Sequence, residues 1–126
     1  MKKKIVVLLA FLILASVIFT NLNKGFATDD RANIYDIVLH DNGYQPSEIT
    51  IEKGTLVRFS TTRDKPHWPA SNLHPTHFIY SDFDPLRALD PEETWEFVFD
   101  KVGVWQFHDH IRSYYRGTIT VTDPAK

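Results

Sequence analysis

Alternation of apolar and polar residues with a period of two is the feature that most restricts how this chain can fold. The clearest case is TWEFVFD, residues 94–100, in which Trp95, Phe97 and Phe99 share one face while Glu96 and Val98 share the other. Successive side chains of a β-strand point to opposite faces, so such a segment can bury one face in a core. The pattern predicts a strand, because the apolar residues of a helix would recur every three or four positions.

Further segments of this kind are separated by short turn sequences. They are residues 33–40, 48–61 with an interruption at Lys53-Gly54, 103–110 and 116–122. Asn42-Gly43, in the turn before the second segment, is a strong local hairpin signal. No segment of useful length after residue 27 has helical periodicity. Strands of this length, with turns about every 8 to 12 residues, predict an all-β sandwich or barrel.

The first 27 residues have a different composition. Three lysines precede an apolar run from Ile5 to Thr20, and Gly25-Phe26-Ala27 ends in a small residue. A basic start, a short apolar core and a small terminal residue are typical of a secretory signal peptide, and the run is short for a helix that crosses about 30 Å of hydrocarbon. We predict a signal peptide at residues 1–27 and one domain at 28–126 outside the cytoplasm, either periplasmic, secreted or, if the signal is uncleaved, membrane-anchored on the outer side.

Charge and cysteine content restrict the partners of this domain. Residues 28–126 hold ten basic and sixteen acidic residues, a net charge of −6. Nucleic acid requires basic patches, so it is not a predicted partner. The chain has no cysteine, so disulfides cannot stabilise the domain and no thiolate can bind a metal.

One long segment does not follow the strand pattern. Residues 62–91 contain five of the seven prolines and three of the six histidines. Connections of this length inside a compact domain are uncommon and are often functional, although a partly ordered connection is the alternative. The histidine content favours a functional segment.

The sequence HDH, residues 108–110, is a candidate pair of metal ligands. On a strand, His108 and His110 share a face with their roots about 6 to 7 Å apart, which allows both imidazoles to bind one ion. Asp109 points the other way, together with Trp105 and Phe107. If these aromatic residues face the core, the two histidines point outward, and Asp109 lies at the rim of the core and needs a polar partner.

A second histidine cluster, HWPASNLHPTH, lies in the long segment and contains His67, His74 and His77. Imidazoles from a proline-rich loop that meet those at the end of a strand would form a metal site without sulfur. A cap of neutral, hydrogen-bonded histidines is the alternative. The sixth histidine, His40, ends the first strand alone and is predicted to be structural.

The order of these segments resembles that of the cupredoxins. DNGYQPSEITIEKGTLVRFS is similar to the opening strands of the family, and DKPHWPASNLHPTH lies where the family has its first histidine ligand. DPEETWEFVFDKVGVWQFHDHIRSYYRGTITV is similar to its C-terminal part, so the resemblance covers about residues 34–122 and implies a Greek-key β-sandwich. Asp109 stands where blue-copper cupredoxins have a cysteine, and residues 112–115 lack the expected histidine. The resemblance therefore implies copper without a blue site.

HPTH and HDH also resemble the HPxH and HCH segments of multicopper oxidases. This resemblance implies that His77, His108 and His110 bind copper. We expect His67 or His74 to be a fourth ligand. His74 and Asp109 match positions of the lost blue site. We expect Asp109 to accept a hydrogen bond from a ligand imidazole and so to orient it. Copper is the predicted ion and zinc is the alternative, because imidazole suits both.

Three functions are compatible with these features. The first is an extracytoplasmic copper-binding protein with an all-histidine, non-blue site of the type 2 kind, whose candidate partner is a redox or metal-delivery protein. The second is a small redox enzyme in which a mononuclear copper site reduces a small oxygen or nitrogen species with electrons from a partner. The third is a metal-free interaction module that uses the aromatic residues of its loops. No catalytic residue is predicted.

Overall fold

The computed structural model describes residues 34–126, and the predicted signal peptide at residues 1–27 lies outside this range. Eight strands and one short 3-10 helix occupy the described residues. They are β1 (Ile34–His40), β2 (Gly43–Gln45), β3 (Glu48–Glu52), β4 (Thr55–Thr61), β5 (Pro69–Ser71), η1 (Phe78–Tyr80), β6 (Trp95–Phe99), β7 (Gly103–Asp109) and β8 (Arg116–Thr122). Between residues 34 and 126, no helix has the length and hydrophobicity that a membrane span requires.

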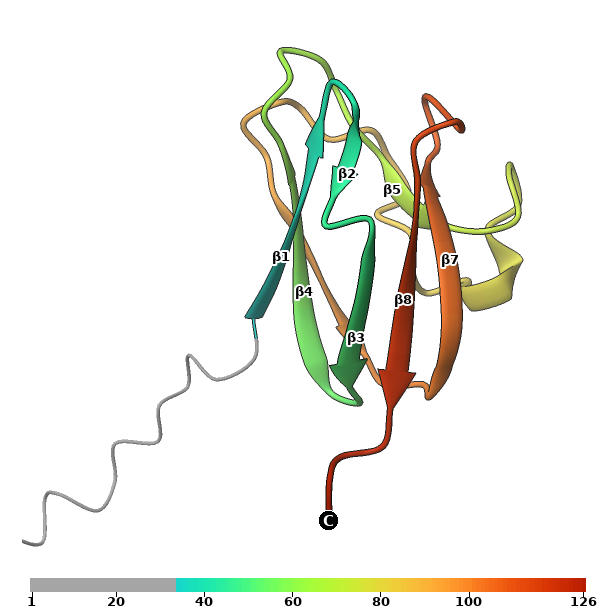
Figure 1. Ribbon diagram of the computed structural model, residues 1–126. Helices are drawn as coiled ribbons and strands as arrows, with labels where there is room; N and C mark the ends of the chain where they lie inside the picture. Colours follow the sequence, from blue (N-terminus) through green and yellow to red (C-terminus); the bar gives the residue numbers. More distant parts are fainter. Residues whose placement is uncertain (1–33) are drawn as a thin grey trace, which may run out of the picture. The chain divides into compact units, whose positions relative to one another are not determined.

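The strands form two four-stranded sheets, and the predicted all-β sandwich is confirmed (Figure 1). One sheet has the order β2-β1-β4-β6 and the other the order β3-β8-β7-β5. β1 pairs in parallel with β4, and β3 pairs in parallel with β8. The consecutive strands β3 and β4 lie in different sheets. The turn that separates them contains Gly54, whose φ of +92° is readily adopted only by glycine.

Aromatic side chains from both sheets fill the core. The ring centroid of Phe59 on β4 lies 5.6 Å from that of Phe107 on β7 and 5.4 Å from that of Phe83. The alternation of β6 is confirmed, because Phe97 packs against the core and Phe99 is fully buried. The mixed aromatic and aliphatic core compensates for the absence of disulfides, since burial of large apolar side chains is the main stabilising term.

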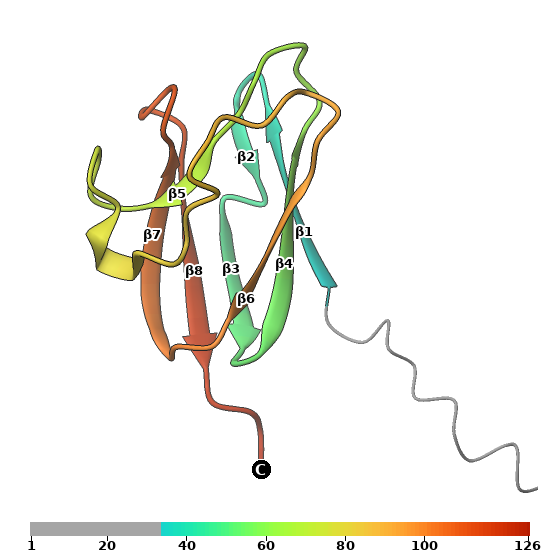
Figure 2. The ribbon, with the colours of Figure 1, turned by 180° about the vertical axis from the view of Figure 1, so that it is seen from behind.

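The long connection between β4 and β6 is an ordered part of the sandwich. It leaves the first sheet after β4, adds β5 to the edge of the second sheet, forms η1 and returns to the first sheet as β6 (Figure 2). Phe83 and Tyr80 are buried in the core, and the hydroxyl of Tyr80 donates a hydrogen bond to Asp100. Burial and this hydrogen bond raise the pKa of Tyr80 to about 12. The alternative of a partly ordered connection is therefore wrong.

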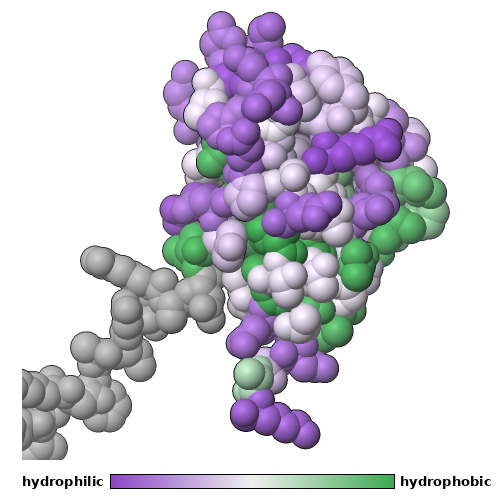
Figure 3. Space-filling view, viewed as in Figure 1, coloured by the Kyte–Doolittle hydropathy of each residue, from purple (hydrophilic) through white to green (hydrophobic). Residues whose placement is uncertain are grey.

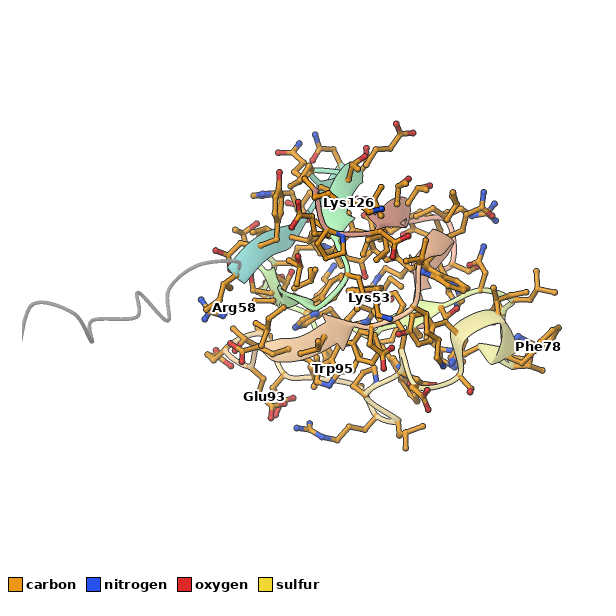
Figure 4. The ribbon with its side chains drawn as sticks, turned by 90° about the horizontal axis from the view of Figure 1, so that it is seen from below. Lys53, Arg58, Phe78, Glu93, Trp95 and Lys126 are labelled. Atoms are coloured by element: carbon orange, nitrogen blue, oxygen red, sulfur yellow. The ribbon has the colours of Figure 1, made fainter. Side chains whose placement is uncertain are left out.

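The outer side of this connection exposes apolar residues. Leu73, Phe78 and Ile79 are exposed, and apolar surface gathers over the η1 edge of the molecule (Figure 3). The ring of Phe78 points away from the domain (Figure 4), with 61% of the residue exposed. Aromatic residues of the loop thus divide between the core and a surface next to the histidines.

Strand β7 separates the core from the histidines by its alternation. Trp105 and Phe107 pack toward the core, whereas His108 lies on the opposite face. Gly117 pairs with Phe107 across the ladder with β8. A Cβ atom at Gly117 would lie 2.4 Å from the ring of Phe107, so only glycine leaves room for this ring. Core packing therefore sets the position of the strand that carries the histidines.

Candidate metal centre

Four histidines gather at one end of β7. His74 and His77 come from the segment between β5 and η1, His108 from β7 and His110 from the residue directly after it. One nitrogen from each imidazole lies within 4.8 Å of those of the other three. The sequence clusters HPTH and HDH are therefore brought together in space.

Direct contacts between the rings show which nitrogens face the centre of the group. Nδ1 of His74 lies 3.2 Å from Nε2 of His108, and Nε2 of His77 lies 2.8 Å from Nδ1 of His110. Ligand nitrogens around a tetrahedral ion with bonds near 2 Å are about 3.3 Å apart, and trans nitrogens of a square-planar ion are about 4 Å apart. The four nitrogens therefore fit one ion after small rotations of the rings.

Two side chains fix the tautomers of two of these imidazoles. Nδ1–H of His77 donates to Oδ2 of Asp84 at 2.5 Å, and Nδ1–H of His108 donates to Oδ1 of Asn72 at 2.8 Å. A histidine that donates through one nitrogen presents the lone pair of the other, so both rings direct Nε2 toward the group. Carboxylate and amide acceptors of this kind commonly orient metal-binding histidines.

Trp68 connects Asp84 with a third imidazole. Its indole Nε1–H donates to Oδ1 of Asp84 at 2.7 Å, and its ring lies over His110 with the ring centroids 4.4 Å apart. Burial acts to raise the pKa of Asp84, but the hydrogen bonds from His77 and Trp68 lower it on balance. Asp84 therefore remains a carboxylate that can hold the N–H of His77.

His77 has a backbone conformation that is unusual for a residue with a side chain. It precedes η1 with φ 55° and ψ 19°, in the left-handed region. Its amide donates to the carbonyl of Leu73 at 2.7 Å, which closes a tight turn around Pro75. Such strain is kept where the surrounding structure requires it, and it concentrates at functional sites.

The expectation that both strand histidines point outward is only partly correct. They lie on the face of β7 opposite Phe107, but His108 is only 2% exposed. The reason is that the segment after β5 places His74 and His77 against His108, with ring centroids 5.1 and 5.2 Å from its ring. The amide of Asn72 donates to the carbonyl of Gln106, and the amide of His110 donates to the carbonyl of Trp68.

His67 and Asp109 have other partners. His67 is fully buried outside the four-histidine group, and its Nε2–H donates to the carbonyl of Glu93 at 3.2 Å. The carboxylate of Asp109 accepts hydrogen bonds from the backbone amides of Trp68 and Arg112, at 3.2 and 2.8 Å. We expected Asp109 to orient an imidazole, but alternation along β7 places it on the core face. Asp84 and Asn72 have that position instead.

Burial lowers the pKa of three histidines in this region, His108, His110 and His67. Desolvation, followed by the neighbouring charges of His77, His74, His110 and Arg116, lowers the pKa of His108 to about 4. Burial also lowers the pKa of His110 and of His67. Neutral imidazole is the form that can bind a metal ion, and the lowered pKa values favour this form in His108 and His110 at neutral pH.

This shift predicts how the stability of the metal-free protein depends on pH. The ordinary pKa of histidine is about 6.5, so between pH 6.5 and 4 the unfolded chain binds a proton at position 108 that the folded chain does not. The free energy of unfolding is therefore expected to be highest above pH 6.5 and to fall by up to about 3 kcal/mol toward pH 4 from His108 alone. Urea denaturation with a chelator at several pH values measures this, and His108→Asn should flatten the dependence. A slope that is equal in both proteins would contradict the assignment.

Comparisons with known proteins agree with the fold. A family model described as a cupredoxin-like domain matches residues 5–121. A purple cupredoxin from Nitrosopumilus maritimus is 22% identical with a TM-score of 0.61, covering 70% of this chain and 99% of that chain. A reduced amicyanin variant is 14% identical with a TM-score of 0.62, covering 72% of this chain and 84% of that chain. A copper-containing nitrite reductase from Thermus scotoductus is 21% identical with a TM-score of 0.58, covering 72% of this chain and 23% of that chain. No curated protein sequence matches significantly.

Proposed function

Because this chain belongs to the cupredoxin-like domain family, we propose that it is an extracytoplasmic copper-binding protein with an all-histidine, non-blue site. The observation that carries the proposal is the meeting of four imidazole nitrogens within 4.8 Å in a chain that has no cysteine. A copper ion held only by imidazoles lacks the thiolate bond of blue copper sites, so the site is expected to be of type 2. The signal-like residues 1–27 support the extracytoplasmic location.

The proposed ligand atoms follow from the hydrogen bonds around the site. His77 and His108 would bind through Nε2, because Asp84 and Asn72 accept the protons on their Nδ1 atoms. His110 and His74 would bind through Nδ1, which in each ring faces a neighbouring imidazole. Imidazole suits both copper and zinc, but an unconstrained nitrogen site binds Cu(II) more tightly than Zn(II), and the fold family also supports copper.

We propose that a redox or metal-delivery protein docks at the exposed histidine of the site. His74 is exposed, whereas His77 and His108 are buried. The exposed apolar residues Leu73 and Phe78 flank it along the chain. A polar ligand surrounded by apolar surface suits brief contact with a partner protein.

Metal titration followed by electron paramagnetic resonance tests the proposed function. The purified protein is expected to bind one Cu(II) per chain tighter than micromolar, with a type 2 spectrum, nitrogen hyperfine coupling and no intense blue absorption. A protein that takes up no Cu(II) at this affinity would contradict the proposal. Preference for Zn(II) in direct competition would replace copper with zinc.

Asp84→Asn tests whether the carboxylate beside His77 supports the metal. The substitution keeps the size of the side chain but removes the charge that holds the N–H of His77, so the Cu(II) affinity is expected to fall about 10-fold to 100-fold. Asp82→Asn is a matched control, because Asp82 pairs with Lys101 at the surface. Equal affinities of the two variants, measured by competition with a chelator, would show that Asp84 has no such role.

A further inference from the structure

A hollow of about 250 Å³ borders one edge of the four-histidine group. The side chains around it come from the segment after β5, from β7, from the connection between β7 and β8, and from the first residue of β8. They are Asn72, Leu73, His74, His108, Ser113 and Arg116. None of these residues is acidic, although the described domain is rich in carboxylates.

Two side chains of this hollow, Arg116 and Asn72, keep hydrogen-bond donors for which no acceptor lies within residues 34–126. Arg116 uses its Nε–H to donate to the carbonyl of Ser113 at 3.0 Å, and within residues 34–126 its guanidinium makes no ion pair. Asn72 uses Oδ1 as the acceptor for His108, which leaves its NH₂ group as a donor. A guanidinium fork next to an amide donor suits a planar oxyanion, which can accept two parallel hydrogen bonds.

The hollow also borders the candidate metal site, because two of the four histidines line it. The other two histidines are covered by different groups: His77 is buried with Asp84 bonded to it, and the indole of Trp68 lies over His110. His74, which is exposed, and His108 line the hollow itself. A small molecule that approaches the ion therefore meets Arg116 on this side.

We propose that this hollow binds a small monovalent oxyanion, with the guanidinium of Arg116 as one contact and the ion held by the four histidines as the other. The second contact rests on the proposed copper site, whereas the first depends only on residues of the hollow. The oxyanion would complete the coordination of the ion from outside, as the substrate or regulatory ligand of the same site. Arg116 then acts by binding and orienting the anion.

Formate, the smallest carboxylate, tests the first contact in the metal-free protein. Titration followed by NMR is expected to give saturable shifts of the Arg116 guanidinium and of the Asn72 side-chain amide, and the shift of the Asn72 amide should disappear in Arg116→Gln. Arg112→Gln is the matched control, because Arg112 lies in the connection that directly precedes β8 but donates to the carbonyl of Pro66 outside the hollow. Absence of shifts at Arg116 in the wild-type protein, or equal loss in both variants, would overturn the proposal.

The Cu(II)-loaded protein tests the second contact. Formate is expected to change the electron paramagnetic resonance spectrum, and Arg116→Gln should weaken its affinity about 10-fold to 100-fold while Arg112→Gln changes it less than about twofold. Bound copper whose spectrum does not respond to formate would overturn this inference and leave the proposed function intact. Formate shifts in a protein that binds no copper would refute the proposed function and support the Arg116 contact alone.

Discussion

Replacing His77 and His110 together with alanine is expected to abolish high-affinity Cu(II) binding, with a loss of roughly 1000-fold or more. These two imidazoles are in direct contact at 2.8 Å, and they come from the two different segments that build the site. A four-ligand site of this kind is worth on the order of 10 kcal/mol, so the loss of two ligands removes several kcal/mol of binding free energy. The remaining pair, His74 and His108, cannot enclose the ion.

Two single variants distinguish this effect from a general loss of structure. His40→Ala removes a histidine that lies outside the group and contacts Thr62 at the end of β1, so copper affinity should not change. His67→Ala removes a buried ring that lies outside the group, so the protein is expected to become less stable while still binding one copper ion per chain. Copper binding that survives the double substitution, or that is lost in His67→Ala with the fold intact, would contradict the assigned ligands.

Phe107→Ala is expected to lower the free energy of unfolding by about 3 to 5 kcal/mol, the range for truncating a fully buried phenylalanine. Phe107 is fully buried, and its ring contacts those of Tyr44 and Phe59 with centroid distances of 4.9 and 5.6 Å. Phe78→Ala is the matched control, because 61% of Phe78 is exposed. The control should change stability by less than about 0.5 kcal/mol. Urea denaturation of the metal-free proteins at pH 7.5 measures both values.

A double-mutant cycle that combines Phe107→Ala with Gly117→Ala tests whether the ring of Phe107 is the group that excludes a side chain at position 117. In the wild-type protein, Gly117→Ala is expected to cost about 1 to 3 kcal/mol, because the new Cβ would lie 2.4 Å from the ring of Phe107. The cost should be smaller in the Phe107→Ala background, where only the contact of 2.8 Å with the carbonyl of Ser47 remains. Equal costs in both backgrounds would show that the ring is not what excludes a side chain at position 117.

Much of the fold was predictable because alternation is a local property of the sequence. The strands β6, β7 and β8 were recognised from side chains that face the core at every second residue. The short strands β2 and β5 were not recognised, because three residues are too few for a pattern. The placement of β3 and β4 in different sheets was not predicted either, since it depends on pairing with distant strands.

The histidine group was predictable for a similar reason, whereas its supporting residues were not. The two histidines of HPTH are close in sequence, and so are those of HDH, so each pair could be recognised as candidate metal ligands from the sequence alone. Asp84, Asn72 and Trp68 are close to the imidazoles because of the tertiary structure around β5 and β7. Their positions in the sequence do not indicate these contacts. His67 and Asp109 were selected because they are close to the other histidines in sequence, but their backbone positions direct them to other partners.

The two faces of strand β7 have different functions. Trp105 and Phe107 pack against the core on one face, and His108 lies on the other face, followed by His110 directly after the strand. The hydrogen-bonded ladder with β8, which sets Phe107 opposite Gly117, holds the two sets apart. A shift of the register by one residue would move every side chain of β7 to the opposite face, placing imidazoles in the apolar core and aromatic rings next to the other histidines. Gly117 on the neighbouring strand β8 leaves room for the ring of Phe107. This fit favours the observed register and thereby the position of the four-histidine group.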